Sequence, residues 1–399
     1  MRIYLDHNAT TPVDPAAAEA MMRALQDLFG NASSVHYYGQ QAKAAIDTAR
    51  SAVSALIGGE PSEIIFTSGG TEADNFAIRG VAEAQEVTGR KHLITSGIEH
   101  EAALNTYKAL ARRGWKTTVL PLDASGIVSP DRLRDAITDE TALVSIMHAN
   151  NEIGTIQPVA ELAKLAHAHG ALFHTDAVQT AGKIPVNARG GTSSSSSSAG
   201  EPLDVDLLAI SGHKFYGPKG VGALWVKRGV RLAPFMAGGK QERNRRAGTE
   251  NVPGIIGVGA AATLALAKMP VESVRLAALR DRLEGGILKN VPNTDVNGTR
   301  GMRVPNTTNI SFERIEAESL LIALDLEGVA VSTGSACSSG TLEPSHVLKA
   351  MGLPSHRAQN SIRFSLGASN TEEQIDHVIE ILPRIVTKLR SLSAVGSRS

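Results

Sequence analysis

A lysine and a carboxylate each follow a short apolar run that is typical of a buried strand. Lys214 ends the segment Ser-Gly-His-Lys, just before the turn Gly-Pro-Lys-Gly. Its small neighbours leave the amine open, so an aldehyde cofactor could form a Schiff base with it, although most lysines are simply solvated. Asp176 follows the run 171–174, where a carboxylate needs a partner. A pyridinium nitrogen would serve, and Gln179 could bind a ring hydroxyl beside it.

A glycine turn and a helix start lie together at residues 67–75, with the sequence Thr-Ser-Gly-Gly-Thr-Glu-Ala-Asp-Asn. Free N–H groups and the helix dipole favour an anion there, and Gly70 and Thr71 would contact a phosphate. An ordinary helix N-cap explains the pattern about as well, and the segment lacks the ending of a nucleotide P-loop. His100 follows another predicted strand and could stack on a ring and shuttle protons, or be structural.

Cys337 is the only cysteine among the 399 residues. It excludes an intrachain disulfide and a multi-thiolate metal site within one chain, and we predict no metal. Glycine and serine residues surround it, which favours an exposed loop and a nucleophilic thiol over a buried apolar position. Arg363 lies in the alternating run 361–365, so its side chain points away from those of Ile362 and Phe364. It could bind a substrate carboxylate through two hydrogen bonds or form a surface salt bridge.

The elements that must position these residues alternate between short apolar runs and helical patterns. This alternation predicts an α/β fold with a mainly parallel sheet, in which ligands bind at the carboxyl ends of the strands. Predicted strands cover residues 64–67, 92–95, 142–146, 171–174 and 207–210, and predicted helices cover 102–113 and 159–169. The candidate residues follow those strand ends.

A change of pattern after residue 256 indicates a second domain. A long helical stretch, 260–288, precedes predicted strands at 308–312, 329–332 and 361–365. We expect a large domain of residues 13–256 and a smaller α+β domain of residues 1–12 and 257–399. The serine run 193–198 is low-complexity sequence and is expected to form a mobile surface loop.

Composition narrows the classes of function. Lys and Arg together number 40, as do Asp and Glu, so nothing favours nucleic acid or an anionic membrane. No apolar run approaches the roughly 20 residues of a membrane-spanning helix, and the N-terminus lacks the apolar stretch of a signal peptide. We therefore expect a soluble cytoplasmic protein that binds neither nucleic acid nor membrane.

These motifs, in this order, resemble the NifS/IscS family of cysteine desulfurases over nearly the whole chain. The segments that carry the resemblance are 5–12, 150–154, 211–214, 246–249, 335–337 and 342–345. The Ser/Gly-rich setting of Cys337 is similar to the first of the family's two groups, whose catalytic loop is long and mobile. The serine-rich segment before Leu203 looks longer than the usual connection there.

The resemblance implies a homodimeric fold-type I enzyme that contains pyridoxal 5′-phosphate. Lys214 would bind the cofactor aldehyde, Asp176 the pyridine nitrogen and Gln179 the ring hydroxyl, while His100 would stack on the ring. The other implied contacts are those to the phosphate, from Gly70, Thr71, Ser211, Gly212, His213 and the partner's Thr249, and those that orient the substrate, from Asn151 and Arg363.

The reaction implied by the resemblance is the removal of sulfur from L-cysteine. Lys214 or His100 would move the α-proton, Cys337 would keep the sulfur as a persulfide, and L-alanine would leave. An acceptor such as an iron–sulfur scaffold protein would receive the sulfur, although the tail 391–399 lacks a clear counterpart of the docking segment of some members. An aminotransferase or a selenocysteine lyase would share the cofactor residues, and only the Cys337 loop separates them. The alternative from a different functional class is a non-catalytic scaffold protein.

Overall fold

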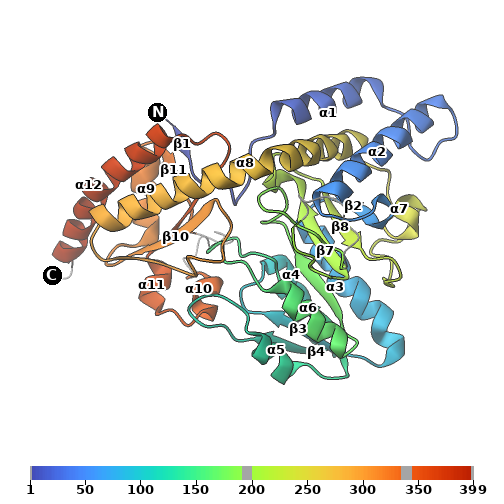
Figure 1. Cartoon of the computed structure of the whole chain (residues 1–399), viewed down its shortest axis with the longest axis horizontal. Helices are drawn as coiled ribbons and strands as arrows, with labels where there is room; N and C mark the ends of the chain where they lie inside the picture. Colours follow the sequence, from blue (N-terminus) through green and yellow to red (C-terminus); the bar gives the residue numbers. More distant parts are fainter. Residues whose placement is uncertain (1, 191–199, 334–343, 397–399) are drawn as a thin grey trace.

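The computed structural model describes residues 2–190, 200–333 and 344–396, which form two lobes connected by the long helix α8 (Val252–Asn290) (Figure 1). The serine run 193–198 and Cys337 lie outside the described residues. One lobe contains a large sheet with helices on both faces. The other contains a small sheet covered by α8 and the C-terminal helix.

The large sheet has seven strands in the order β2-β8-β7-β6-β5-β3-β4. They are β2 (Ile64–Thr67), β3 (His92–Ser96), β4 (Lys116–Leu120), β5 (Thr141–Ser145), β6 (Leu172–Asp176), β7 (Leu207–Ser211) and β8 (Gly222–Val226). Only β8 runs antiparallel to its neighbours, so the predicted α/β class with a mainly parallel sheet is confirmed. The five predicted strands of this lobe all form, with ends shifted by one or two residues, whereas β4 and β8 were not predicted.

Both faces of the large sheet are buried, and this explains why its strands read as continuous apolar runs. In β2, Phe66 packs into one apolar cluster and Ile65 into the cluster on the opposite face. In β7, Leu208 packs into the same cluster as Phe66, and Leu207 packs into the same cluster as Ile65. The helices and short turns of this lobe are α1 (Pro15–Asp27), α2 (Tyr37–Leu56), η1 (Pro61–Glu63), α3 (Gly70–Gln85), η2 (Glu86–Thr88), α4 (Glu101–Ala111), α5 (Pro130–Ala136), α6 (Val159–Ala168), η3 (Gly212–Lys214) and α7 (Gln241–Asn244).

The smaller lobe has its own apolar core. Its antiparallel sheet has the order β12-β10-β9, and a parallel pair, β1-β11, lies beside it. Ile3 and Leu5 from the N-terminus are fully buried in this core together with Ile310 and Phe364. The elements are β1 (Ile3–Tyr4), β9 (Thr294–Val296), β10 (Thr307–Phe312), α9 (Ala317–Leu326), β11 (Val329–Ala330), α10 (His346–Ala350), α11 (Ser355–Gln359), β12 (Ser361–Ser365) and α12 (Glu372–Gly396).

Helix α8 contributes to both cores. Val258 and Ala262 pack in the first apolar cluster, whereas Leu276 and Leu283 pack in that of the smaller lobe, and Pro270 lies between them. The helix begins at Val252, eight residues before its predicted start at residue 260. The predicted domain boundary at 256 stays a prediction. By length and a mean hydropathy of 1.6 this helix could cross a membrane, but half of its most apolar window is buried, as expected of a core helix.

Candidate active site

Lys214 stands at the carboxyl end of β7, on the turn η3. Its amine donates hydrogen bonds to two backbone carbonyls of the N-terminal segment, Asn8 O at 2.6 Å and Ala9 O at 2.8 Å. Burial, with a smaller contribution from the Arg363 guanidinium, lowers the pKa of Lys214 to about 8. A substantial fraction of this amine is therefore uncharged and nucleophilic at mildly alkaline pH.

Asp176 ends β6, the strand beside β7 in the sheet. Its side chain is only 6% exposed, and one oxygen accepts a hydrogen bond from Val178 N at 2.8 Å. Burial raises its pKa, while the nearby Lys214 and His100 oppose that effect. No ion pair to Asp176 occurs among the residues that the structure describes. A buried carboxylate that lacks an ion-pair partner among the described residues fits a cationic ring nitrogen.

Three more buried ionisable side chains lie near Asp176. His174 Nε2 is 3.7 Å from Asp74 Oδ1, and neither atom has a hydrogen bond within the described part of the chain. Burial lowers the pKa of His174 to about 3, raises that of Glu99 to about 8, and raises that of Asp74 well above its ordinary value. Burial thus favours the uncharged form of each of these three groups, so none of them forms an ion pair with Asp176. None of the three was predicted as a site residue.

The start of α3 forms a cradle beside these residues. Gly69 has φ 155° and ψ −176°, a conformation that is essentially restricted to glycine, and no side chain caps the helix. A β-carbon on Gly70 would lie 3.0 Å from Val178 Cγ2 and 3.5 Å from Ser211 Cβ, so the helix start abuts the ends of both central strands. Gly70, Thr71 and Ser211, predicted to bind phosphate, therefore meet in one place.

The remaining predicted phosphate residues divide into two groups. Gly212 is packed so closely that a β-carbon would lie 2.7 Å from Val258 Cγ2, and His213 Nδ1 is 3.1 Å from Thr10 Oγ1. Burial lowers the pKa of His213 to about 4, so its ring is neutral. Thr249 is exposed on the surface of this chain, as a residue that contacts a second subunit would be.

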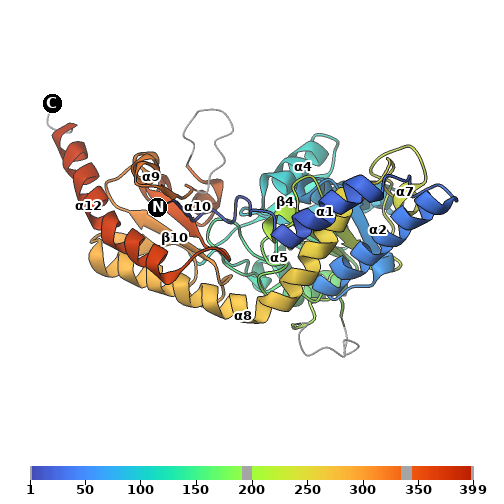
Figure 2. The ribbon, with the colours of Figure 1, turned by 90° about the horizontal axis from the view of Figure 1, so that it is seen from above.

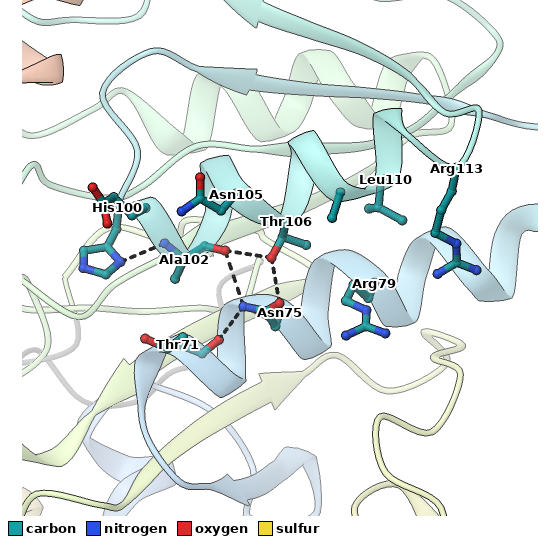
Figure 3. Close-up of a pocket in the computed structure, with 11 residues that line it drawn as sticks. Thr71, Asn75, Arg79, His100, Ala102, Asn105, Thr106, Leu110 and Arg113 are labelled. Atoms are coloured by element: carbon teal, nitrogen blue, oxygen red, sulfur yellow. Dashed lines mark hydrogen bonds between the residues drawn. The ribbon is translucent and has the colours of Figure 1, made fainter. Parts of the chain in front are cut away.

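His100 and Thr71 line one end of a cavity of about 580 Å³ between α3 and α4 (Figure 3). Asn75 connects the two helices, because its amide donates to Ala102 O and its oxygen accepts from Thr106 Oγ1. His100 Nδ1 accepts a hydrogen bond from Ala102 N at 3.1 Å and caps α4. This bond leaves the ring proton on Nε2. Its stacking on a ring stays a prediction.

Arg363 points from β12 toward this site. Ile362 and Phe364 are fully buried in the core of the smaller lobe, which confirms the predicted alternation along the strand. The guanidinium donates to Asp6 Oδ1 at 2.6 Å and to the Asn151 carbonyl at 3.0 Å. Its Nε, in contrast, has no hydrogen-bond partner within the described residues. Asp6 lies in the motif 5–12, which contributes to the family resemblance, but no role was predicted for this residue.

Asn8 joins the two lobes beneath Lys214. Its amide donates to Thr307 Oγ1 at 2.8 Å and its backbone N–H donates to Ser365 Oγ at 3.0 Å, both in the smaller lobe. Its carbonyl accepts from Gln179 Nε2 at 3.1 Å, and its side-chain oxygen accepts from Lys183 Nζ at 3.0 Å. Neither Asn8 nor Lys183 was predicted as a site residue, and the only signal was that Asn8 lies in the motif 5–12.

Cys337, the predicted nucleophile, lies outside the described residues, but both ends of the segment that carries it are described. Before it, Ser332 exchanges two backbone hydrogen bonds with Arg363. After it, the Ser345 hydroxyl donates to the buried carboxyl group of Glu152, the neighbour of Asn151. The described residues on either side of that segment, Ser332 and Ser345, therefore lie close to the residues predicted to orient the substrate.

The described residues include no cluster of three or more His, Cys, Asp or Glu side chains that could hold a metal ion.

Residues 3–378 match the family model described as aminotransferase class-V. A cysteine desulfurase IscS of Dictyoglomus turgidum is 50% identical over 391 residues, which cover 98% of this chain and 96% of that protein.

Solved structures agree with that comparison. A NifS-like protein has a TM-score of 0.89 and 38% identity, with 98% of this chain and 100% of that chain covered. A structure described as SspA in complex with cysteine has a TM-score of 0.78 and 35% identity, with 92% of this chain and 99% of that chain covered. The fold and the sequence of this chain are thus similar to those of the same group of proteins over almost their full length.

Proposed function

The chain belongs to the NifS/IscS family of cysteine desulfurases, within the aminotransferase class-V proteins, and we propose that it removes sulfur from L-cysteine with pyridoxal 5′-phosphate as its cofactor. The observation that carries the proposal is the convergence of Lys214 and Asp176 at the ends of adjacent strands. One presents an amine with a lowered pKa, and the other presents a buried carboxylate with no ion-pair partner among the described residues.

The residues fit each chemical part of this cofactor. The uncapped start of α3, with Thr71 and Ser211, suits its phosphate, and Asp176 suits its ring nitrogen. Gln179 suits the ring hydroxyl, and Lys214 suits the aldehyde. When bound, the cofactor supplies an electron sink for the charge that develops at the substrate α-carbon.

The protein's own residues then divide the remaining work. Arg363 and Asn151 would orient the substrate carboxylate, and Asp6 would hold one side of the guanidinium in place. Lys214 would take the α-proton as a free amine, and the Nε2–H of His100 would be the second proton carrier.

Cys337 would receive the sulfur. Its thiolate attacks the sulfur atom of the substrate, a new S–S bond forms, and the C–S bond breaks. The electron pair of that bond stays with the carbon fragment, which takes up a proton and leaves as L-alanine. The anchoring of residues 332 and 345 beside the substrate residues supports a short path for this attack.

The assembly and the destination of the sulfur are also part of this proposal. The exposed Thr249 and the open cavity beside Thr71 suit a homodimer in which each subunit completes the other's phosphate site. The persulfide would pass to an acceptor protein, such as an iron–sulfur scaffold, in the cytoplasm. The relatives named cysteine desulfurase IscS support this role.

The test is sulfide release from L-cysteine with a reductant, with alanine measured as co-product. Equal sulfide and alanine from the wild type, and neither from a Cys337→Ala variant that still binds the cofactor, are expected. Thr48→Ala, an exposed change on α2, is the control and should retain full activity. Pyruvate and ammonia as products, turnover of selenocysteine alone, or full activity of Cys337→Ala would each reject the proposal.

A further inference from the structure

Lys183 is a lysine of the active-site region that the proposed reaction does not use. It lines the small cavity behind Lys214, together with His7 and Tyr216. Its amine donates to Gln179 Oε1 at 2.7 Å and to Asn8 Oδ1 at 3.0 Å. Burial, with the nearby charges of Lys214 and Arg363, lowers its pKa well below the ordinary value. The described carboxylates form no ion pair with it, so its contacts are with these two amide side chains.

These contacts fix which way the Gln179 amide faces. A side-chain amide has an acceptor end and a donor end, and the two can exchange by a rotation. The Lys183 amine donates at 2.7 Å to the end that carries the oxygen. The other end lies 3.1 Å from the Asn8 carbonyl, an acceptor, and must therefore be the NH₂ group. The reversed amide would place two acceptors together at Asn8 and lose the bond from Lys183.

We propose that Lys183 is a positioning residue that orients the Gln179 amide so that its NH₂ group faces the ring oxygen of the cofactor. The inference rests on the proposed function, because it concerns the cofactor named there. Spacing supports it: Gln179 and Lys183 are four residues apart in a run of turns, which brings their side chains onto one side of the backbone.

The orientation has an electrostatic consequence. With the cofactor bound to Lys214, an ionised ring oxygen would favour the protonated form of that bond, and the Gln179 amide would act on this oxygen. A donor beside that oxygen withdraws charge from it and weakens its hold on the proton, so the linkage loses the proton at lower pH. An acceptor there would do the opposite. The other charged or titratable groups facing this region are Asp6, His7, Asp14, Asp176, Lys214, Tyr216, Lys268, Glu272 and Arg363.

The experiment is a pH titration of the cofactor's yellow absorbance band in the purified holoenzyme. Lys183→Met removes the donor and is expected to raise the pH midpoint by about one unit, equivalent to about 1.4 kcal/mol. Lys183→Arg keeps N–H donors and should remain within about 0.3 units of the wild type, because the guanidinium can still donate to Gln179. Lys164→Met, the same change at an exposed position of α6, is the matched control and should not move the midpoint.

A second background separates orientation from direct charge. In Gln179→Leu there is no amide to orient, so adding Lys183→Met should shift the midpoint by less than about 0.3 units. An equal shift in both backgrounds means that Lys183 acts through its charge alone, and the proposal is then wrong. If Lys183→Met does not fold, Lys183→Gln replaces it. The side chain of the introduced glutamine is one bond shorter than that of lysine, so its amide does not reach Gln179. An unchanged midpoint in that variant also overturns the proposal.

The titration also distinguishes this inference from the function on which it rests. A wild-type protein without the yellow band after incubation with the cofactor would reject the proposed function, and the role of Lys183 would fall with it. A wild-type band with a normal titration, together with an unshifted Lys183→Met, would reject only the role of Lys183.

Discussion

Replacing Glu242 by glutamine tests how the edge of the large sheet next to the phosphate cradle is held. β2 is an edge strand, and its free backbone groups would be exposed without a cover. Glu242 Oε2 accepts from Phe66 N at 3.1 Å, and Arg50 Nη1 donates to Ile64 O at 2.8 Å. The two side chains also form a bidentate ion pair, with bonds of 2.8 and 2.7 Å, and those of Glu242 and Arg50 are 4% and 8% exposed.

The expected cost follows from this burial. Removing one partner of a buried, hydrogen-bonded ion pair typically costs about 3–5 kcal/mol, because the other charge stays buried without compensation. Glu242 and Arg243 also have positive φ values of 42° and 58°, a conformation that the surrounding contacts must maintain. With an unfolding entropy of about 2.1 cal/mol/K per residue, this cost lowers Tm by about 4 to 6 °C if the whole chain unfolds together.

The assay is thermal unfolding of the holoenzyme, with each variant at the same protein concentration because binding between subunits also shifts Tm. Glu19→Gln is the control, because the pair between Glu19 and Arg23 is exposed and such pairs contribute about 1 kcal/mol or less. The same protein batches should be tested for cofactor affinity, because β2 leads directly into the cradle at Gly69. A Tm loss for Glu242→Gln no larger than that for Glu19→Gln would refute the reasoning.

Two further results are expected. Recombination of the cofactor with the cofactor-free protein should accelerate with rising pH and reach half its maximum near pH 8, because only the uncharged Lys214 amine attacks an aldehyde and its pKa is lowered to about 8. A midpoint near that of an ordinary lysine would contradict the burial of this amine. Gly69→Ala should destabilise the protein by about 1–3 kcal/mol in urea unfolding, because its conformation is nearly restricted to glycine. Unchanged stability and unchanged phosphate binding would contradict the account of the cradle. Gly285→Ala, in helix α8 where φ is not positive and an added β-carbon meets open space, is the comparison.

The fold class could be predicted because the strands are buried on both faces. β2, β3, β5, β6 and β7 read as continuous apolar runs, and helical patterns separate most of them. β8 was missed because it begins at Gly222, where a β-carbon would lie 2.7 Å from Gly69. Its glycine reflects a close approach to the cradle, and that contact has no local signal in the sequence. β4 was missed because three of its five residues are polar and only Leu120 is fully buried, so it lacks a continuous apolar run.

The candidate site could be predicted where one residue type performs a function that few others can. A lysine after one strand, an acid after the strand before it and a lone cysteine among glycines and serines each carry a chemical meaning without knowledge of their neighbours. The roles of Asp6, Asn8 and Lys183 could not be predicted in this way. Asp6 and Asn8 act through partners that are more than 170 residues away in the sequence. Lys183 acts through the Gln179 amide, whose orientation also depends on the distant Asn8.

The sequence by itself determined the alternation of buried strands and helices that defines the fold class and the residue types at the strand ends. Burial on one or both faces leaves a periodic pattern of apolar residues, and this pattern is local. Tertiary structure alone decided that the N-terminal segment passes beneath Lys214 and that Glu242 covers the edge of β2. It also decided that Lys183 faces two amides rather than a carboxylate. These contacts depend on which distant groups meet in space, and a hydrogen bond between groups far apart along the chain leaves no periodic pattern in either segment.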